Sequence, residues 1–418
     1  MERRKRSLQG AWMLVVMVGL LASPWPAGAE KLTVAGLDGI YGDALQEGAE
    51  LFQKENPGVE VELVKRPASE LYALLTSSFQ DAPGNVDVVM LEDGWAAEFM
   101  GNGWLLDLEK FGLAVDTDFI GNVMAAGRYP YERGAAHALP MVGNVALLAY
   151  RQDLFEKHGL GEPRDWLDVL EAAVKIDALE SDIDGVVFQG AEGRPVVSVF
   201  LPLLREFGAR VVGPRGNAYL NTGNAEAALK LFLKFEKLAP RGVRDFDDRK
   251  ALEHLRDGRS AMALEVWPAW MPILDDPKTS KVAGQLQPLP SPGLIGVSSP
   301  LLEAWLLGAS SGTRRTELAM KFVGFLTSGS VQKELALRTG LPPTRRSVYT
   351  DPETVSKYRW YPAQLEALES AVPRPRMANW PEVEAVLSRC LRQVLTEGVS
   401  PDEALWEAND RVQALLGR

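Results

Sequence analysis

Strand-like and helix-like segments alternate near the start of the chain, and this alternation constrains the fold most. Residues 32–37 and 59–64 have sequences typical of β-strands. Residues 43–55 and 69–79 have the pattern of helices. Residues 86–91 form an apolar run, typical of a strand buried on both faces of a parallel sheet. Because strands that alternate with helices of about 10–15 residues form right-handed crossovers, the sequence predicts an α/β fold.

The first 29 residues have the three parts of a secretory signal peptide. Residues 2–6 are basic after one acidic position, residues 12–21 are apolar, and residues 27–29 form a small-x-small cleavage site. The apolar run is shorter than the roughly 20 residues that span a bilayer, and prolines follow it at once. We therefore expect a cleaved signal peptide over residues 1–29, rather than a membrane anchor, and an exported protein.

The net charge and the single cysteine narrow the possible partners and the cellular location of the protein. The chain has a formal net charge of −11. Residues 1–29 carry four basic side chains and one acidic one, so the remainder has a net charge of −14, which disfavours nucleic acid as a partner. Cys390 is the single cysteine, so we expect no intramolecular disulfide and no lipid-bearing cysteine after the cleavage site. No second apolar stretch approaches membrane-spanning length, and we expect the mature protein to be a soluble monomer in the periplasm.

The sequence contains no motif of a known type of catalytic or metal site. His137, His158 and His254 lie far apart and lack the spacing of a metal site. There is no nucleophile elbow, no Walker loop and no H-E-x-x-H motif. Cys390 lies in a helical pattern and is interpreted as a buried structural thiol. We expect no catalytic residue, no metal and no cofactor.

Aromatic residues follow two of the predicted strands, beside polar groups. Asp93 and Trp95 come directly after the strand at residues 86–91, and Trp267 follows a short strand at residues 261–265. In open parallel sheets, ligands bind beyond the carboxyl ends of the strands. Sugars suit such sites, because their C–H faces stack on indole rings and their hydroxyls bind carboxylates and amides. Packing of each indole in the core is the alternative.

Several segments, taken in order, resemble the bacterial extracellular solute-binding proteins of the maltose/trehalose type. These proteins are the capture components of ABC sugar importers. No single motif is strong, but the order and spacing of the motifs extend over nearly the whole chain. The motifs lie at residues 52–59, 86–95, 98–99, 103–106, 137–140, 147–154, 261–270, 373–375 and 400–405.

The resemblance implies a periplasmic-binding-protein-like fold, in which two α/β lobes joined by a hinge close on a ligand cleft. By analogy, the chain would cross between the lobes near Pro140, Gln285 and Leu341. The implied N-lobe comprises residues 30–139 plus 285–341, and the implied C-lobe comprises residues 140–284 plus 342–418.

The resemblance also points to the residues of the cleft. The sequence departs from the family pattern at Asn144, at the pair Glu265-Val266 and at the pair Glu303-Ala304. Family members usually have Gly-Gly at the last of these three places. These departures weaken the assignment of maltose or trehalose itself as the ligand. The expected ligand-binding residues are Tyr41, Asp93, Trp95, Asn144, Glu192, Trp267 and Trp305.

The sequence thus favours an exported protein that captures a sugar (an oligosaccharide, disaccharide or glucosyl-polyol) and delivers it to an ABC permease. Two alternatives remain at this point. One is a carbohydrate-active enzyme, which needs two carboxylates about 5–10 Å apart across a cleft. The other is a binding protein for a non-sugar solute. An acidic cleft poor in tryptophan would favour a polyamine, and a cleft rich in arginine would favour a phosphate ester.

Overall fold

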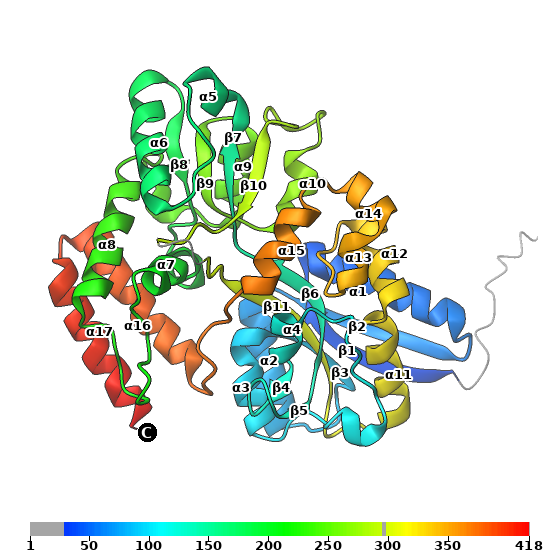
Figure 1. The fold of residues 1–418 in the computed structure, drawn as a ribbon. Coiled ribbons are helices and arrows are strands. Elements are labelled where there is room, and N and C mark those ends of the chain that lie inside the picture. Colours follow the sequence, from blue (N-terminus) through cyan, green and yellow to red (C-terminus); the bar gives the residue numbers. More distant parts are fainter. Residues whose placement is uncertain (1–28, 295–297, 418) are drawn as a thin grey trace, which may run out of the picture.

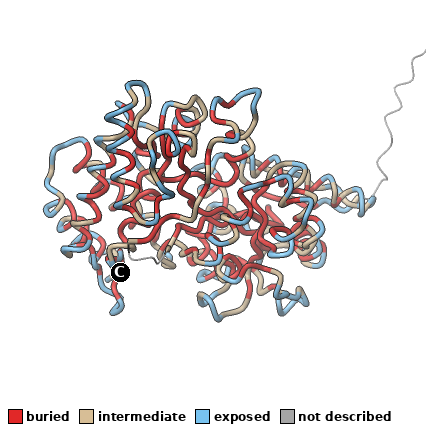
Figure 2. Tube along the Cα trace, turned by 45° about the horizontal axis from the view of Figure 1, so that its top comes forward, coloured by how far each residue is buried: buried red, intermediate tan, exposed pale blue. Residues whose placement is uncertain are grey.

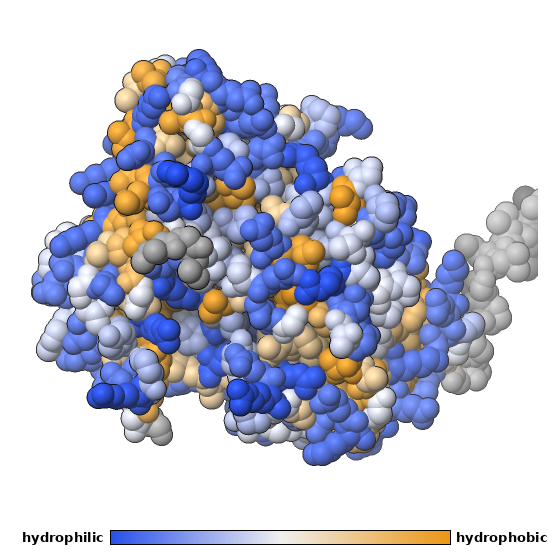
Figure 3. Space-filling view, in the orientation of Figure 1, coloured by the Kyte–Doolittle hydropathy of each residue, from blue (hydrophilic) through white to orange (hydrophobic). Residues whose placement is uncertain are grey.

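The computed structural model describes residues 29–294 and 298–417 of the chain (Figure 1). The predicted signal peptide, residues 1–29, lies outside the described residues except for Ala29. Within the described part, no helix combines the length and apolarity needed to cross a membrane. The face drawn in Figure 3 is largely hydrophilic. Cys390 is buried, as predicted, and burial raises the pKa of its thiol to about 12.

Within the described residues, the first of the two main sheets has five strands in the order β2-β1-β3-β11-β6. Strands β2, β1 and β3 are parallel, whereas β11 runs antiparallel to both β3 and β6. The predicted parallel βαβ unit is therefore confirmed at one edge of the sheet, and the other edge is antiparallel. The strands are β1 (Glu30–Leu37), β2 (Val59–Arg66), β3 (Val88–Glu92), β6 (Leu139–Val145) and β11 (Leu302–Ala309).

The second main sheet has four strands within the described residues, in the order β10-β7-β9-β8. Only β8 and β9 are parallel neighbours there; the other pairs are antiparallel. A small two-stranded sheet is separate from both. The strands are β7 (Leu147–Arg151), β8 (Asp184–Val187), β9 (Ser260–Val266) and β10 (Leu286–Pro290), and the small sheet pairs β4 (Arg128–Tyr129) with β5 (Ala135–Ala136).

Helices cover both sheets, and the two resulting bodies are called the first and the second lobe (Figure 1). Buried residues are concentrated along the strands inside each lobe (Figure 2). The first lobe carries α1 (Gly39–Glu55), α2 (Ala68–Gln80), α3 (Asp93–Gly101), η1 (Glu109–Phe111), α4 (Gly121–Ala125), α11 (Thr316–Leu326), α12 (Gly329–Thr339), α13 (Arg346–Thr350), α14 (Pro352–Lys357) and α15 (Tyr361–Ser370). The second carries α5 (Gln152–Lys157), α6 (Trp166–Leu179), α7 (Arg194–Glu206), α8 (Gly223–Glu236), η2 (Val243–Asp245), α9 (Asp248–Arg256), η3 (Pro268–Trp270), α10 (Met271–Leu274), α16 (Trp380–Arg392), η4 (Gln393–Glu397) and α17 (Pro401–Leu416).

Local sequence explains where several helices begin. Ser400 precedes α17, and its Oγ accepts a hydrogen bond of 3.3 Å from the backbone N–H of Glu403, as in a capping box. Asp165 caps α6 in the same way, because its carboxylate accepts from the backbone N–H groups of Leu167 and Asp168. These contacts satisfy amide groups that a helix leaves without partners in its first turn.

The chain passes between the sheets at short connections. Only Ala146 separates β6, in the first sheet, from β7, in the second. Helices α12 to α14 pack with one another and with α1, whereas α16 packs with α7 and η4. Helix α15 contacts both sheets, through β10 on one side and β6 on the other, and the predicted crossings near Gln285 and Leu341 stay predictions. The exact division of the chain into lobes stays a prediction.

The core of the first lobe provides a test of this packing. Phe52 on α1 is fully buried and meets Phe322 and Phe325 of α11 edge to face, with ring centroids 5.1 and 5.3 Å apart. We expect Phe52→Ala to lower the free energy of unfolding by about 3–5 kcal/mol, because it leaves a cavity between the two helices. Phe111→Ala is the matched control, since that ring is 53% exposed and its loss costs little. Urea unfolding of both variants measures the difference; equal stabilities would contradict the packing.

Candidate functional site

A cavity of about 920 Å³ lies between the two lobes. Its walls come from the carboxyl end of β3, the start of α1, strand β11 and helix α7, among other elements. Aromatic side chains line it from both lobes, and carboxyl, amide and guanidinium groups lie between them. The first lobe contributes Tyr41, Tyr72, Glu92, Trp95, Asn144, Glu303 and Trp305, and the second contributes Gln189, Arg194, Ser198, Asp248, Trp267, Trp270 and Glu384.

Five of the seven residues predicted to bind ligand line this cavity. They come from α1, α3, β6, β11 and the turn after β9, so the fold gathers segments that are far apart in sequence. The five are Tyr41, Trp95, Asn144, Trp267 and Trp305. Their role in binding stays a prediction, but the structure does bring them together.

The other two predicted residues do not line the cavity. Asp93 is fully buried, and its Oδ1 accepts a hydrogen bond of 3.2 Å from the backbone N–H of Ala304. Glu192 is exposed in the loop before α7. In each case a neighbouring residue faces the cavity instead: Glu92, the last residue of β3, and Arg194, the first residue of α7. Asp93 begins α3 and Glu192 lies in a loop, so a shift of one or two positions where an element begins changes which side chain reaches the cavity.

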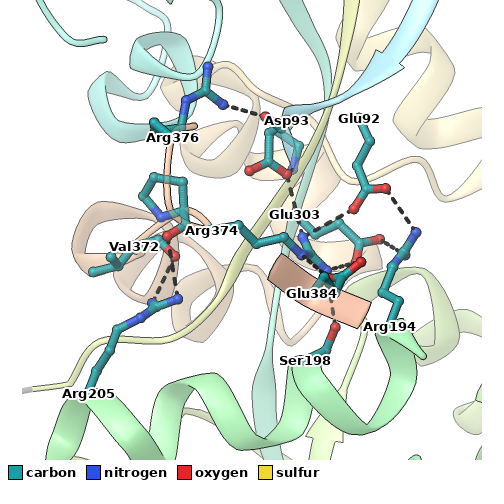
Figure 4. Close-up of polar contacts among 12 residues, drawn as sticks. Glu92, Asp93, Arg194, Ser198, Arg205, Glu303, Val372, Arg374, Arg376 and Glu384 are labelled. Atoms are coloured by element: carbon teal, nitrogen blue, oxygen red, sulfur yellow. Dashed lines mark hydrogen bonds and ion pairs between the residues drawn. The ribbon is translucent and has the colours of Figure 1, made fainter. Parts of the chain in front are cut away.

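Four charged side chains form a closed ring at one wall of the cavity (Figure 4). Arg194 contacts Glu92 at 3.1 Å and Glu303 at 2.7 Å. Arg374 closes the ring, because its Nη1 lies 3.2 Å from Oε1 of Glu92 and its Nη2 lies 3.2 Å from Oε2 of Glu303. Glu92 and Glu303 come from the adjacent strands β3 and β11 of the first lobe. Arg194 begins α7 of the second lobe, so the ring links the two lobes.

Burial makes this ring electrostatically strong. The side chains of Arg374, Glu92 and Glu303 are 1%, 4% and 3% exposed. Burial alone would raise the pKa of Glu303, but Arg194 and Arg374 outweigh it and hold that pKa below its usual value. Burial likewise opposes the charge of Arg374, yet Glu92 and Glu303 raise its pKa above the usual range. Glu303 and Arg374 are therefore charged.

Three further carboxyl groups lie around the ring, and they have fewer basic partners than the carboxylates of the ring have. Burial, reinforced by Glu92, raises the pKa of Asp93 to about 7, although Arg374 opposes the shift. Burial and the charge of Glu303 raise the pKa of Glu265 to about 8. Burial also raises the pKa of Glu384, whose Oε1 lies 3.5 Å from Nε of Arg374. Near neutral pH this wall therefore holds protons as well as charges.

Three buried polar atoms of cavity-lining residues have no hydrogen-bond partner among residues 29–294 and 298–417: Oε1 of Glu384, which has only its ion-pair contact with Arg374, and two atoms on the first sheet. The latter two are Oδ1 of Asn144 and Nε1 of Trp305, and both side chains come from strands of the first sheet. Each of these two residues is only 1% exposed. A buried polar group without a partner costs free energy, so these two atoms are suited to bind polar groups of a ligand.

The indole rings are held in place by one another and by neighbouring rings. Trp95 meets Trp305 edge to face, with centroids 5.6 Å apart, and packs against Tyr72 at 5.3 Å. The Tyr72 hydroxyl donates a hydrogen bond of 2.8 Å to Glu98. Trp267 and Trp270 line the cavity from the second lobe. Of these four indoles, Trp270 alone was not among the predicted site residues, although it follows the same strand as Trp267.

Comparisons with known proteins agree with this geometry. A family model described as "Bacterial extracellular solute-binding protein" matches residues 38–333. The maltose-bound MalE3 of T. maritima is similar, with 30% sequence identity, a TM-score of 0.83 and coverage of 93% of this chain and 100% of that chain. A solute-binding protein of Agrobacterium radiobacter K84 in complex with ribitol is 25% identical, with a TM-score of 0.84 and coverage of 93% and 100%.

A curated protein named as a mannitol-binding protein, from Pseudomonas aeruginosa, is also similar. It is 23% identical over 404 residues, which make up 91% of this chain and 92% of that protein. Together, the family match and the likeness to solved structures confirm the predicted two-lobe α/β fold and the predicted resemblance.

The protonated carboxyl groups give this site a measurable pH dependence. Because the pKa of Glu265 is raised to about 8, stability is greatest where the group is protonated in both states, and it falls as pH rises from about 4.5 to 8. We expect Glu265→Gln to remove up to about 1.4 kcal/mol per pH unit of this decline, since glutamine still accepts from Nε2 of Gln189. Thermal melts from pH 5 to 9 test this. A variant whose melting temperature falls as steeply as that of the unmodified protein would contradict it.

Proposed function

The chain belongs to the bacterial extracellular solute-binding proteins, and we propose that it captures a small sugar or polyol and delivers it to the permease of an ABC importer. The observation that carries the proposal is the cavity between the lobes, with indole rings and hydrogen-bonding groups on both sides. Relatives with maltose, ribitol or mannitol in their names or titles support this class of ligand.

The chemistry of the cavity suits a sugar. Indoles from both lobes offer flat apolar faces for the C–H groups of a ring, and Trp95 and Trp305 are held perpendicular to each other, at 87°. The free acceptor of Asn144 and the free donor of Trp305 pair with hydroxyls, which both donate and accept. A volume of about 920 Å³ lies within the range of small-molecule sites and leaves room for more than one sugar ring.

The mechanism is capture by closure of the lobes. Because groups from both lobes line the cavity, a ligand makes its full set of contacts only when the lobes are together. Binding then shifts the population toward the closed form, by as much as the ligand's affinities for the two forms differ. A permease that contacts both lobes at once would bind this closed form in preference to the open one.

The alternatives considered from the sequence are less well supported. The family consists of solute-binding proteins rather than enzymes. A phosphate ester needs a guanidinium group free to bind it. Of the described residues that line the cavity, Arg194 alone carries a guanidinium group, and two carboxylates already hold it.

We extend the proposal to the form and place of the mature protein. It is a monomer in the periplasm, released by cleavage after Ala29. The basic and apolar segments of residues 1–29 support the cleavage. N-terminal sequencing of the exported protein should begin at Glu30, and light scattering should give the mass of one chain. A retained N-terminus or a dimeric mass would contradict this part of the proposal.

The indole contacts can be tested by substitution. We expect Trp95→Ala and Trp267→Ala each to weaken sugar binding about tenfold or more, because each removes an aromatic face from one lobe. Trp406→Ala is the control, since that side chain on α17 is 59% exposed and does not line the cavity. Calorimetry with maltose, mannitol and ribitol gives the affinities, and melts without ligand separate binding from stability. Unchanged affinity in both cavity variants would rule out the stacking contacts.

A further inference from the structure

Carboxyl groups dominate the charge of the cavity. Five line it: Asp38, Glu92 and Glu303 from the first lobe, and Asp248 and Glu384 from the second. Among the described lining residues, the one cationic side chain is that of Arg194. The formal charges of Glu92, Glu303, Arg194 and Arg374 cancel, and burial raises the pKa of Glu384, so Asp38 and Asp248 set the charge that a ligand meets.

Two of these carboxyl groups have no ion pair. Within residues 29–294 and 298–417, neither Asp38 nor Asp248 lies within 4.0 Å of a basic side chain. Glu384 has one cationic contact, with Arg374 at 3.5 Å. Burial raises the pKa of Tyr41, and Glu303 and Asp248 add to this shift while Arg194 opposes it, so these three charged groups lie around the same hydroxyl. Carboxylates from both lobes therefore lie near Tyr41, and Arg194 offsets part of their charge.

Asn144 is an independent sign of what is bound there. Its side chain is 1% exposed and lines the same cavity, and its Oδ1 lacks a partner among the described residues. An unpaired acceptor beside carboxylates calls for a ligand group with more donors than acceptors. A hydroxyl brings one donor, whereas an ammonium group brings three donors and no acceptor.

The indoles distinguish among cations. The face of an indole attracts an ammonium group within about 6 Å of its centre, so aromatic walls and carboxylates act together on a cation. The same faces stack on the apolar side of a sugar ring. A cavity that is both acidic and lined by four tryptophans, Trp95, Trp267, Trp270 and Trp305, therefore matches a ring that carries a basic nitrogen better than a flexible polyamine.

We propose that the cleft selects a sugar or cyclitol that bears a basic amino group, and that Asp248 and Asn144 bind the ammonium while the indoles hold the ring. This rests on the proposed capture of a sugar and specifies its class. It follows that sugars with a phosphate or carboxylate group are rejected, because they would meet unpaired negative charge.

Matched pairs of ligands test the selection. Glucosamine, mannosamine and galactosamine are compared by calorimetry at pH 6.5 with glucose, mannose and galactose, and N-acetylglucosamine supplies the substituted ring without charge. 2-Deoxystreptamine and spermidine extend the panel to a cyclitol and a linear polyamine. We expect at least one charged ring to bind tenfold or more tightly than its neutral partner, and this preference to fall as salt rises.

A pair of variants assigns the preference to the proposed contact. Asp248→Asn should lower the ratio of the affinity for the amino compound to the affinity for its neutral partner tenfold or more. Asp402→Asn is the matched control, because Asp402 also lies in the first turn of a helix, is exposed, and does not line the cavity. A variant Asp248→Asn with unchanged preference would overturn the assigned contact.

The possible results distinguish this inference from the proposed capture of a sugar, on which it rests. Neutral sugars that bind as tightly as their amino partners would overturn the inference and leave sugar capture standing. Both would be overturned if spermidine alone bound. Both would also be overturned if none of these compounds bound and maltose, mannitol and ribitol did not bind either.

Discussion

The closed ring of Glu92, Arg194, Glu303 and Arg374 fixes the wall on which the cavity is built (Figure 4). Within the ring each carboxylate contacts both guanidinium groups, so removal of any member leaves each neighbour with one partner and one buried charge uncompensated, at a cost of about 3–5 kcal/mol. The ring holds the end of β3 next to β11. Trp95 follows that end by one turn of helix, and Trp305 lies two residues after Glu303 on the same strand, so the perpendicular pair of indoles depends on the ring.

The ring also bears on the movement of the lobes. Its carboxylates come from the first sheet, while Arg194 comes from α7 and Arg374 from the segment that leads to α16. If the lobes separate, these groups pass into water, where hydration replaces the ion pairs. Because the desolvation of buried ion pairs nearly cancels their attraction, such a ring adds little net free energy to closure. The contacts of a ligand can then decide the equilibrium, as capture requires.

Much of this arrangement was predictable from local patterns, and the remainder was not. Strand ends beside aromatic residues pointed to Trp95 and Trp267, and the departure from the family pattern at Glu303 marked a member of the ring. The sequence pointed to Asp93, whereas its neighbour Glu92 lines the cavity, because sequence does not show where β3 ends and α3 begins. Arg374 lies far along the chain from Glu92, and such a pairing depends on how the lobes pack, which no local pattern reports.

The structure handles its acidic groups in two ways, according to where they lie. Those inside the wall are neutralised, either by the arginines of the ring or by protons, as the pKa of about 7 for Asp93 and of about 8 for Glu265 indicates. A carboxyl group that stays buried can be neutralised by an ion pair with a basic side chain or by a proton. Asp248 faces the space that a ligand enters, so no group of the wall neutralises it, and positive charge can reach it only from solvent or from the ligand. The carboxyl groups that the fold leaves without an ion pair therefore determine which charged ligands are selected.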